Sequence, residues 1–207
     1  MKYQAILLFG APGSGKGTQG HILASIPGLV HVATGEIFRD LRVGSELGRV
    51  FLDYSSRGAL VPDSFTVQLW REHVDALVKL GRYDPDNDTL VLDGIPRSVA
   101  QAQLLGDLVD VRRIYYLDCA DRRIMFMRLK RRALQEHRLD DASDDVIRHR
   151  HEVYEGETAP VLGYYSGDLV CRIDTGRPPV DVLADIVSDL RNILPHPADI
   201  SADETRS

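Results

Sequence analysis

The sequence predicts an α/β fold in which helices cover both faces of a central five-stranded parallel sheet. Five short apolar runs are typical of strands, and helix-like segments separate them. This alternation favours a three-layer sandwich over an antiparallel sheet. The 207 residues suit one compact domain, and a hydrophobic content of 43% supports an ordinary core. The expected strands are 3–9, 29–33, 89–92, 113–118 and 169–173.

The first expected strand runs directly into a glycine-rich segment, GAPGSGKGT at 10–18, and a helix-compatible run begins near Gly15. Glycines here allow backbone angles that a Cβ would forbid, so that successive N–H groups can point at phosphate oxygens. The pattern fits G-x-x-x-x-G-K, although Gly17 stands where Ser or Thr is expected and Thr18 comes one place later. We interpret the segment as a phosphate-binding loop with Lys16 as its cation, rather than a glycine-rich surface turn.

The segments that follow the other expected strands are polar, glycine-containing or basic. They read TGEIFR after the second strand, DGIPRS after the third and DTGR after the last. Ligands of open parallel sheets bind beyond the carboxyl ends of the strands. The sequence therefore predicts a phosphate-lined cleft at this edge of the sheet.

Some segments depart from the alternation of strands and helices. The stretch 41–62 is predicted to form a pair of short helices punctuated by glycines, and 132–141 a short charged loop between two long helices. The stretch 80–90 is predicted to be a turn-rich surface loop. The tail 195–207 has no core-forming pattern, so we expect it to be disordered.

Composition and charge exclude several classes of partner. A net charge of −6 and an isoelectric point of about 5.6 argue against a nucleic-acid-binding surface. No apolar run approaches the length of a membrane span, and the start MKYQAILLFG is too short for a signal peptide. Cys119 and Cys171 are isolated, which favours free thiols in a reducing compartment and excludes a four-cysteine zinc site. We expect a soluble cytoplasmic protein without a membrane partner.

Several separated motifs in order make the chain resemble the nucleoside monophosphate kinases, and the adenylate kinases among them. The motifs are GAPGSGKGTQ, TGEIFR, GALVPD, LDGIPRSVAQA, RLKRR followed by RLDD, and RHEVYEGETAPVLGYY. The resemblance reaches about residue 194 and implies a P-loop fold. Its expected parts are a core at 1–33, 63–131 and 142–194, a helical NMP-binding insertion at 34–62, and a short lid at 132–141.

The resemblance also implies an activity. A monomer of this family transfers the terminal phosphoryl group of ATP to AMP in the presence of Mg²⁺, giving two ADP. The implied catalytic residues are Lys16, Arg39, Arg97, Arg132, Arg138 and Arg150. Asp93 would hold Mg²⁺ through water, with the ion itself on the phosphates.

The two nucleotide sites are implied residue by residue. Those for ATP are Gly13, Ser14, Gly15, Lys16, Gly17, Thr18, Arg128, Arg132 and Arg177. Those for AMP are Thr34, Arg39, Ala59, Leu60, Val61, Gly94, Ile95, Pro96, Arg97, Gln101, Arg138 and Arg150. Within these sets, Gln101 would read the adenine edge, and Arg138 and Arg150 would bridge both nucleotides.

The cations make chemical sense independently of the resemblance. Each phosphate monoester carries roughly −1.5 to −2 at neutral pH, and the guanidinium fork grips phosphate bidentately. A nucleotide phosphate is already anionic, so its attack needs no general base. On the helix that contains RRIMFMRLKRR, Arg128 and Arg132 point away from the apolar side, although a solvated face or a weak nucleic-acid patch is the alternative.

Two acidic and two histidine positions have competing interpretations. Asp140 and Asp141 are predicted to position lid arginines, with a solvated acidic turn as the alternative. His149 and His151 form an H-x-H pattern, which we interpret as surface helix residues rather than metal ligands, because further ligands at suitable spacing are missing.

The family pattern is not matched everywhere. Glu36 replaces the usual aspartate of TGD, Ala33 replaces a small hydroxyl residue, and His137 stands where the lid commonly has glycine. Because of these departures, the resemblance does not predict the affinity for nucleotides or the mobility of the lid.

Three other functions compete. A UMP/CMP kinase of the same family would keep the mechanism, but GALVPD and Gln101 favour adenine. A GTPase switch would need an N-K-x-D motif, which the chain lacks. A nucleotide-binding protein that has lost catalysis would not need the whole set of cations.

Overall fold

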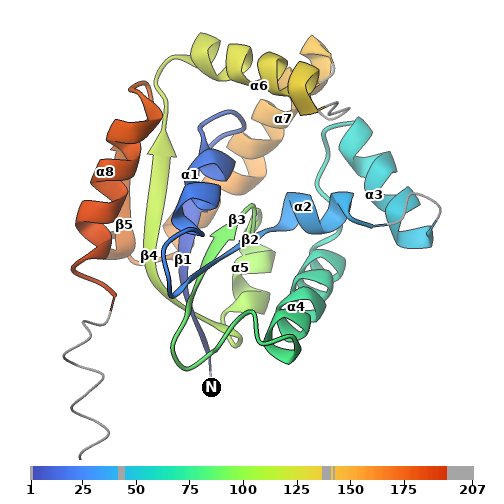
Figure 1. Ribbon diagram of the computed structural model, residues 1–207. Coiled ribbons are helices and arrows are strands. Elements are labelled where there is room, and N and C mark those ends of the chain that lie inside the picture. Colours follow the sequence, from blue (N-terminus) through green and yellow to red (C-terminus); the bar gives the residue numbers. More distant parts are fainter. Residues whose placement is uncertain (1, 42–44, 137–140, 142, 195–207) are drawn as a thin grey trace, which may run out of the picture.

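The computed structural model describes residues 2–41, 45–136, 141 and 143–194. The predicted tail 195–207 and the predicted positions His137, Arg138 and Asp140 lie outside the described residues. Figure 1 shows a central sheet with helices on both of its faces. None of the described helices is long and apolar enough to cross a lipid bilayer.

The sheet contains five strands, all parallel, in the order β2-β3-β1-β4-β5, which confirms the predicted fold class (Figure 1). The strands are β1 (Tyr3–Phe9), β2 (Leu29–Ala33), β3 (Thr89–Asp93), β4 (Val109–Asp118) and β5 (Val170–Asp174). The first two have the predicted bounds. β4 begins four residues earlier than predicted, because VDVR alternates polar and apolar side chains at the start of the strand.

Helices separate the strands and cover the sheet. They are α1 (Lys16–Leu23), α2 (Thr34–Arg39), α3 (Glu46–Ser56), α4 (Asp63–Lys79), α5 (Val99–Leu105), α6 (Arg122–Glu136), α7 (Asp144–Val153) and α8 (Pro179–Leu190). After α7 come a π-helical turn at Tyr154–Thr158 and short 3₁₀ turns at Ala159–Tyr164 and Gly167–Leu169.

Alternation along β1 divides the core into two layers. Ala5, Leu7 and Phe9 belong to the layer that includes Trp70 of α4, which is fully buried. Ile6 and Leu8 belong to the opposite layer, with the apolar side chains of α1 and α8. A two-residue period with both faces apolar is expected for the middle strand of a covered parallel sheet. Because β1 is central and buried on both faces, the loop that follows it starts from a rigid support.

Two predictions about the connecting segments were wrong. The stretch 41–62 contains one described helix, α3, and Gly48 lies in its first turn, where its N–H donates to Oγ of Ser45 at 3.0 Å. The companion helix is α2, built from TGEIFR. The predicted loop 132–141 is also partly helical, because α6 continues to Glu136 through the good helix formers RALQE.

Candidate functional site

A cavity of about 580 Å³ opens beyond the carboxyl ends of β1 and β3. Among the described residues that line it, cations outnumber carboxylates. The cations are Lys16, Arg39, Arg97, Arg128, Arg131, Arg132, Arg150 and Arg177, and the carboxylates are Glu36, Asp93 and Glu136. The excess positive charge suits a strongly anionic ligand.

The loop after β1 lies too close to neighbouring backbone for a side chain at Gly10 and Gly13. At Gly13, φ is +83° and a Cβ would lie 2.6 Å from the carbonyl oxygen of Met125 in α6. At Gly15, φ is +103°, and α1 begins at the next residue, Lys16. The glycines therefore let the loop turn tightly into the N-terminus of a helix, which is a favourable place for a phosphate.

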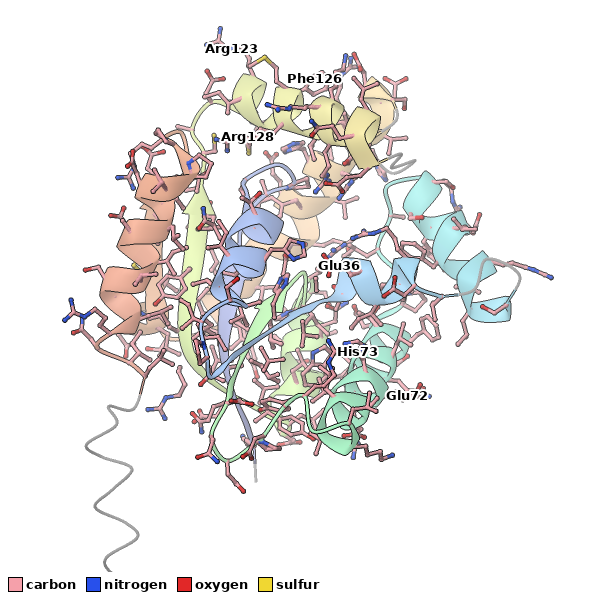
Figure 2. The ribbon with its side chains drawn as sticks, viewed as in Figure 1. Glu36, Glu72, His73, Arg123, Phe126 and Arg128 are labelled. Carbon is pink, nitrogen blue, oxygen red and sulfur yellow. The ribbon has the colours of Figure 1, made fainter. Side chains whose placement is uncertain are left out.

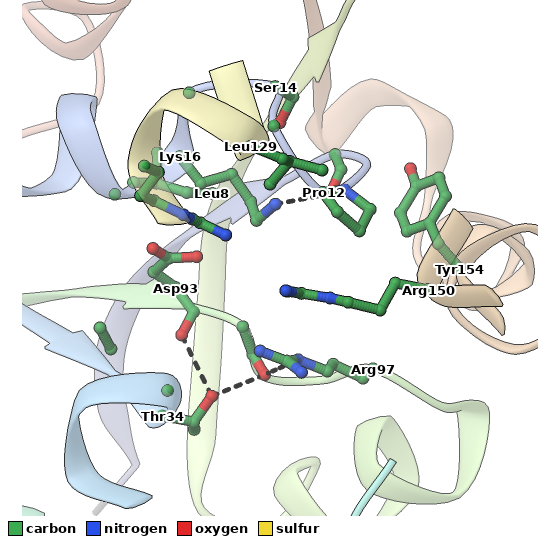
Figure 3. Close-up of a pocket in the computed structure, with 18 of the residues that line it drawn as sticks. Leu8, Pro12, Ser14, Lys16, Thr34, Asp93, Arg97, Leu129, Arg150 and Tyr154 are labelled. Carbon is green, nitrogen blue, oxygen red and sulfur yellow. Dashed lines mark hydrogen bonds between the residues drawn. The ribbon is translucent and has the colours of Figure 1, made fainter. Parts of the chain in front are cut away.

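Lys16 is held inside this loop. Its ammonium group donates to the carbonyl oxygen of Gly10 at 2.7 Å (Figure 3). It also donates to the carbonyl oxygen of Ala11 at 3.1 Å. Burial lowers the pKa of Lys16 to about 8; Asp93 opposes this effect, and nearby arginines, Arg97 first among them, add to it. Asp93 offsets only part of the effect of burial and of the other cations, so an anionic ligand would stabilise the charged form of Lys16 further.

Gly94 organises the opposite side of the cavity. Its carbonyl oxygen accepts hydrogen bonds from Oγ1 of Thr34 at 2.8 Å and from Nε of Arg97 at 2.9 Å (Figure 3). At φ +80°, a Cβ on this residue would lie 2.8 Å from both side chains. The glycine therefore allows a threonine of α2 and an arginine beyond β3 to converge.

Gln101 is buried in α5, and its side-chain amide is fixed from both ends. Oε1 accepts from the backbone N–H of Arg97 at 2.7 Å, while Nε2 donates to Oδ1 of Asp63 at 2.8 Å. The oxygen and nitrogen are thereby oriented, and each keeps one further hydrogen-bonding position. Asp63, which sets this orientation from the start of α4, was not among the predicted site residues.

Asp141 connects α6 and α7, two helices whose arginines line the cavity. Its carboxylate is completely buried and accepts from Arg132 of α6 through Nε at 2.8 Å and Nη2 at 2.5 Å. It also accepts from Nη1 of Arg150 in α7. The structure thus brings Asp141 to the arginines that it was predicted to position. Figure 3 shows Arg150 pointing into the cavity, toward Lys16 and Arg97.

The structure brings nearly all of the predicted site residues to one cavity. Those that line it are Gly13, Ser14, Gly15, Lys16, Gly17, Thr18, Thr34, Arg39, Ala59, Leu60, Val61, Asp93, Gly94, Pro96, Arg97, Gln101, Arg128, Arg132, Arg150 and Arg177. Ile95 does not line it, because its side chain is buried in the core layer that includes Trp70. Arg138 lies outside the described residues.

Two further predicted cations on the ATP side, Arg128 and Arg177, also have protein partners. Arg128 lies below α6 on the side of the core, whereas Arg123 of the same helix points outward (Figure 2). Arg128 donates to the carbonyl oxygen of Thr175 at 2.9 Å. Arg177 donates to the carbonyl oxygen of Asp174 and pairs with Asp185.

An aromatic pair in the cavity was missed by sequence reasoning. The rings of Phe38 in α2 and Phe51 in α3 stack 5.0 Å apart with an interplanar angle of 4°, and both line the cavity. They give the cavity an apolar surface suited to a flat ring. Each phenylalanine looks like an ordinary core residue in its own helix, so the sequence carries no signal for the pair.

The possible metal ligands include one group that the sequence did not indicate. Asp93 offers carboxylate oxygens inside the cavity. His149, part of the H-x-H motif, pairs with Glu152 at 3.5 Å on the surface of α7. A different group of possible ligands, His21, His31 and Glu36, comes together beside the cavity.

Comparisons with known proteins agree with this geometry. The family model described as adenylate kinase matches residues 8–169. The chain is 37% identical to an adenylate kinase of Kocuria rhizophila over 175 residues, covering 82% of this chain and 89% of the relative. It is 39% identical to one of Mycolicibacterium vanbaalenii over 168 residues, covering 79% and 87%. It is 32% identical to one of Flavobacterium psychrophilum over 195 residues, covering 91% and 98%.

Proposed function

This chain belongs to the adenylate kinase family, and we propose that it reversibly transfers the terminal phosphoryl group of ATP to AMP, giving two ADP. The observation that carries the proposal is one cavity with a phosphate loop on one side and the Thr34–Gly94–Arg97 cluster on the other. Two separate cationic ends suit two phosphorylated ligands that meet between them.

On the donor side, we assign the loop Gly13–Thr18 to the ATP phosphates. The N–H groups at the start of α1 and the ammonium of Lys16 would contact them, and the ligand charge would offset the burial of that ammonium. Arg128, Arg132 and Arg177 line the same cavity, and the family resemblance assigns them to the same nucleotide.

On the acceptor side, we assign Arg39 and Arg97 to the phosphate of AMP. Ala59, Leu60 and Val61, with Thr34, Gly94 and Pro96, would surround the nucleoside, and Ile95 would act only through its place in the core. Gln101 would donate and accept at the adenine edge with the hydrogen-bonding positions that Arg97 and Asp63 leave open. This pairing is what favours AMP over CMP or UMP.

The chemistry needs positioning more than proton transfer. An oxygen of the AMP phosphate forms a bond to the terminal phosphorus of ATP while that phosphorus separates from its bridging oxygen, which leaves as ADP. The nucleophile is already anionic. Lys16, Arg132, Arg138 and Arg150 would stabilise the charge on the group in transfer, with Asp141 orienting two of them.

The residues present fit Mg²⁺ as the metal of this reaction. Asp93 is a hard oxygen donor that faces the loop, since its Oδ2 lies 3.7 Å from where a Cβ of Gly17 would be. Mg²⁺ on the nucleotide phosphates supplies charge neutralisation, and Asp93 would hold it through water. Gly17 leaves room for that water.

We also propose that the insertion 34–62 and the lid around 132–141 close over both nucleotides. Closure would exclude water, which competes for the phosphoryl group. Hydrogen exchange with a bisubstrate analogue tests this: both segments should gain protection, and protection confined to the phosphate loop would contradict closure.

The proposal includes a cytoplasmic monomer whose partners are nucleotides rather than nucleic acids. The free thiols of Cys119 and Cys171 and the net charge of −6 support it. Sedimentation at several protein concentrations, with and without nucleic acid, tests the monomer and the absence of such a partner.

The reverse reaction gives the sharpest test of the activity. With ADP and Mg²⁺ as the only nucleotide and metal, the protein should produce ATP and AMP in equal amounts, separated by chromatography. A UMP/CMP kinase would not disproportionate ADP, and a protein that has lost catalysis would leave it unchanged. Either outcome would overturn the proposal.

A further inference from the structure

Three side chains from different elements converge beside the cavity. His21 lies in the last turn of α1, His31 in β2 and Glu36 in the first turn of α2, and one ligand atom from each lies within 4.8 Å of the others. Nε2 of His21 is 3.0 Å from Oε1 of Glu36, and the two imidazole rings are 5.1 Å apart. Figure 2 shows Glu36 on α2, close to α1.

His31 is the unusual member of the group. Its side chain is only 4% exposed, and its Nε2 has no hydrogen-bonding partner among the residues that the structure describes. The nearest carboxylate oxygen, Oδ2 of Asp93, lies 3.9 Å away, which is too far for a hydrogen bond. A buried polar atom left unpaired is destabilising, so its retention beside two other potential ligands points to a missing partner.

The backbone of α1 makes room for this arrangement. A Cβ at Gly20 would lie 2.3 Å from Nε2 of His31, so the imidazole packs where a side chain would otherwise stand. The fold thus places a histidine of β2 directly against the helix that carries His21.

We propose that His21, His31 and Glu36 form a binding site for a divalent transition-metal cation of the zinc class, distinct from Mg²⁺ on the nucleotides. Two imidazoles and one carboxylate form a donor set that suits Zn²⁺, whereas Mg²⁺ prefers oxygen ligands alone. With Zn–N and Zn–O bonds of about 2.0–2.2 Å, tetrahedral ligand atoms lie about 3.4 Å apart. A fourth position stays open to water.

Small side-chain movements complete this geometry. The buried imidazole of His31 is fixed by packing, but the side chains of His21 and Glu36 are 62% and 43% exposed and can rotate toward it. Nε2 of His21 and Oε1 of Glu36 are already 3.0 Å apart, close to the separation of two ligand atoms on one metal ion. The cation would then be held mainly by adjustment of the two exposed ligands.

Such an ion would connect the helix of the phosphate loop to the helix that carries Arg39. His21 and Glu36 both line the cavity, so the ion would lie at its edge. Its binding requires no nucleotide, and the proposal stands independently of the phosphoryl transfer.

The experiment uses the purified full chain, stripped of metal and free of nucleotide. Titration with Co²⁺, followed by visible absorption, should give a four-coordinate spectrum, and calorimetry with Zn²⁺ should give one site per chain. His21→Ala and Glu36→Gln replace exposed ligands, so both variants should fold. Each should weaken Zn²⁺ binding by at least about tenfold, because even outer-shell partners of a metal typically contribute that much.

A matched control comes from α7, where His149 and Glu152 form another exposed His–Glu pair, 3.5 Å apart. His149→Ala should leave Zn²⁺ affinity unchanged. Zn²⁺ should also raise the Tm of the unmodified chain and of this control, but not of His21→Ala. Absence of binding, or equal binding by the unmodified chain, His21→Ala and Glu36→Gln, would overturn the proposal.

Discussion

Asp141 accepts two hydrogen bonds from Arg132, at 2.8 Å from Nε and 2.5 Å from Nη2, although its own carboxylate is completely buried. The other carboxylate oxygen accepts from Arg150. A buried anion is costly unless it is paired, and here two guanidinium groups from α6 and α7 share it. One side chain therefore fixes the orientation of two arginines that line the cavity.

Replacing Asp141 with Asn should damage stability and activity together. The substitution leaves the geometry nearly unchanged but removes the negative charge, so we expect the free energy of unfolding to fall by about 1–3 kcal/mol. The two arginines should lose their fixed orientation, and kcat should fall. Urea unfolding and steady-state kinetics measure both effects.

Asp144 supplies the control for that variant. It pairs with Lys130 at 2.9 Å, but both side chains are about half exposed. Exposed pairs contribute roughly 0–1 kcal/mol, so Asp144→Asn should change little. If Asp141→Asn were as stable and as active as Asp144→Asn, the buried carboxylate would have no orienting role.

Lys16 predicts a pH dependence for ATP binding. The pKa of Lys16, about 8, lies below that of an ordinary lysine. The free protein should therefore lose this proton as the pH rises through 8, whereas the charge of ATP stays constant above that pH. At pH 9 about nine-tenths of the free protein would carry a neutral Lys16, and the Kd for ATP should rise about tenfold. Calorimetric titrations between pH 7 and 9.5 measure this rise. Lys16→Met should bind more weakly with a flat profile; a flat profile in the unmodified protein would contradict the prediction.

Arg97 should affect the acceptor far more than the donor. It is positioned by the carbonyl oxygen of Gly94, on the side of the cavity opposite the phosphate loop. For Arg97→Ala we expect kcat/KM for AMP to fall by at least about a hundredfold, as when a single donor to a developing charge is removed. The Kd for ATP should change less than twofold. An equal loss of binding for AMP and ATP would mean that the cavity is not divided as proposed. Arg112→Ala serves as the control, because Arg112 forms an exposed pair with Asp110.

Gln101 and Asp63 allow a rescue experiment. Gln101→Glu places a carboxylate against Oδ1 of Asp63, where the amide now donates at 2.8 Å. Repulsion should turn the side chain away and raise the KM for AMP by about tenfold, corresponding to about 1.4 kcal/mol. Adding Asp63→Asn restores a donor and an acceptor and should recover part of the loss, with the KM for ATP unaffected throughout. Without any recovery, the orientation of this amide would not explain acceptor binding.

The strands could be predicted from the sequence because their apolar runs end in glycine or polar residues. β1 and β2 were predicted residue for residue, and the middle position of β1 follows from a run that is apolar on both faces. The start of β4 was missed because Asp110 and Arg112 interrupt its apolar pattern. The extension of α6 to Glu136 was missed because a charged sequence is compatible with either a loop or an exposed helix.

Residues of the candidate site could be predicted only where they belong to a recognisable motif. Lys16, Arg97 and Arg150 reach the cavity from segments that the sequence marks clearly. Ile95 belongs to such a motif, but its side chain turns into the core, because neighbouring residues of an extended segment point in opposite directions.

Contacts between elements that are separated along the chain leave no recognisable pattern in the sequence. Phe38 stacks on Phe51 only because α2 packs on α3, and His21 meets His31 only because α1 folds back along β2. Such pairs depend on how elements pack, which the spacing of residues along the chain does not encode.

The most direct test of the central claim is the rate of ADP formation from ATP and Mg²⁺ with AMP, CMP, UMP or GMP offered separately as acceptor. The account predicts rapid turnover with AMP and at least about a hundredfold lower kcat/KM with each of the others, since a site built to hydrogen-bond one base edge leaves polar groups unpaired with another. Preferential turnover with a pyrimidine nucleotide would contradict the roles assigned to Gln101 and the pocket around Val61. No turnover with any acceptor, despite ATP binding, would contradict phosphoryl transfer itself.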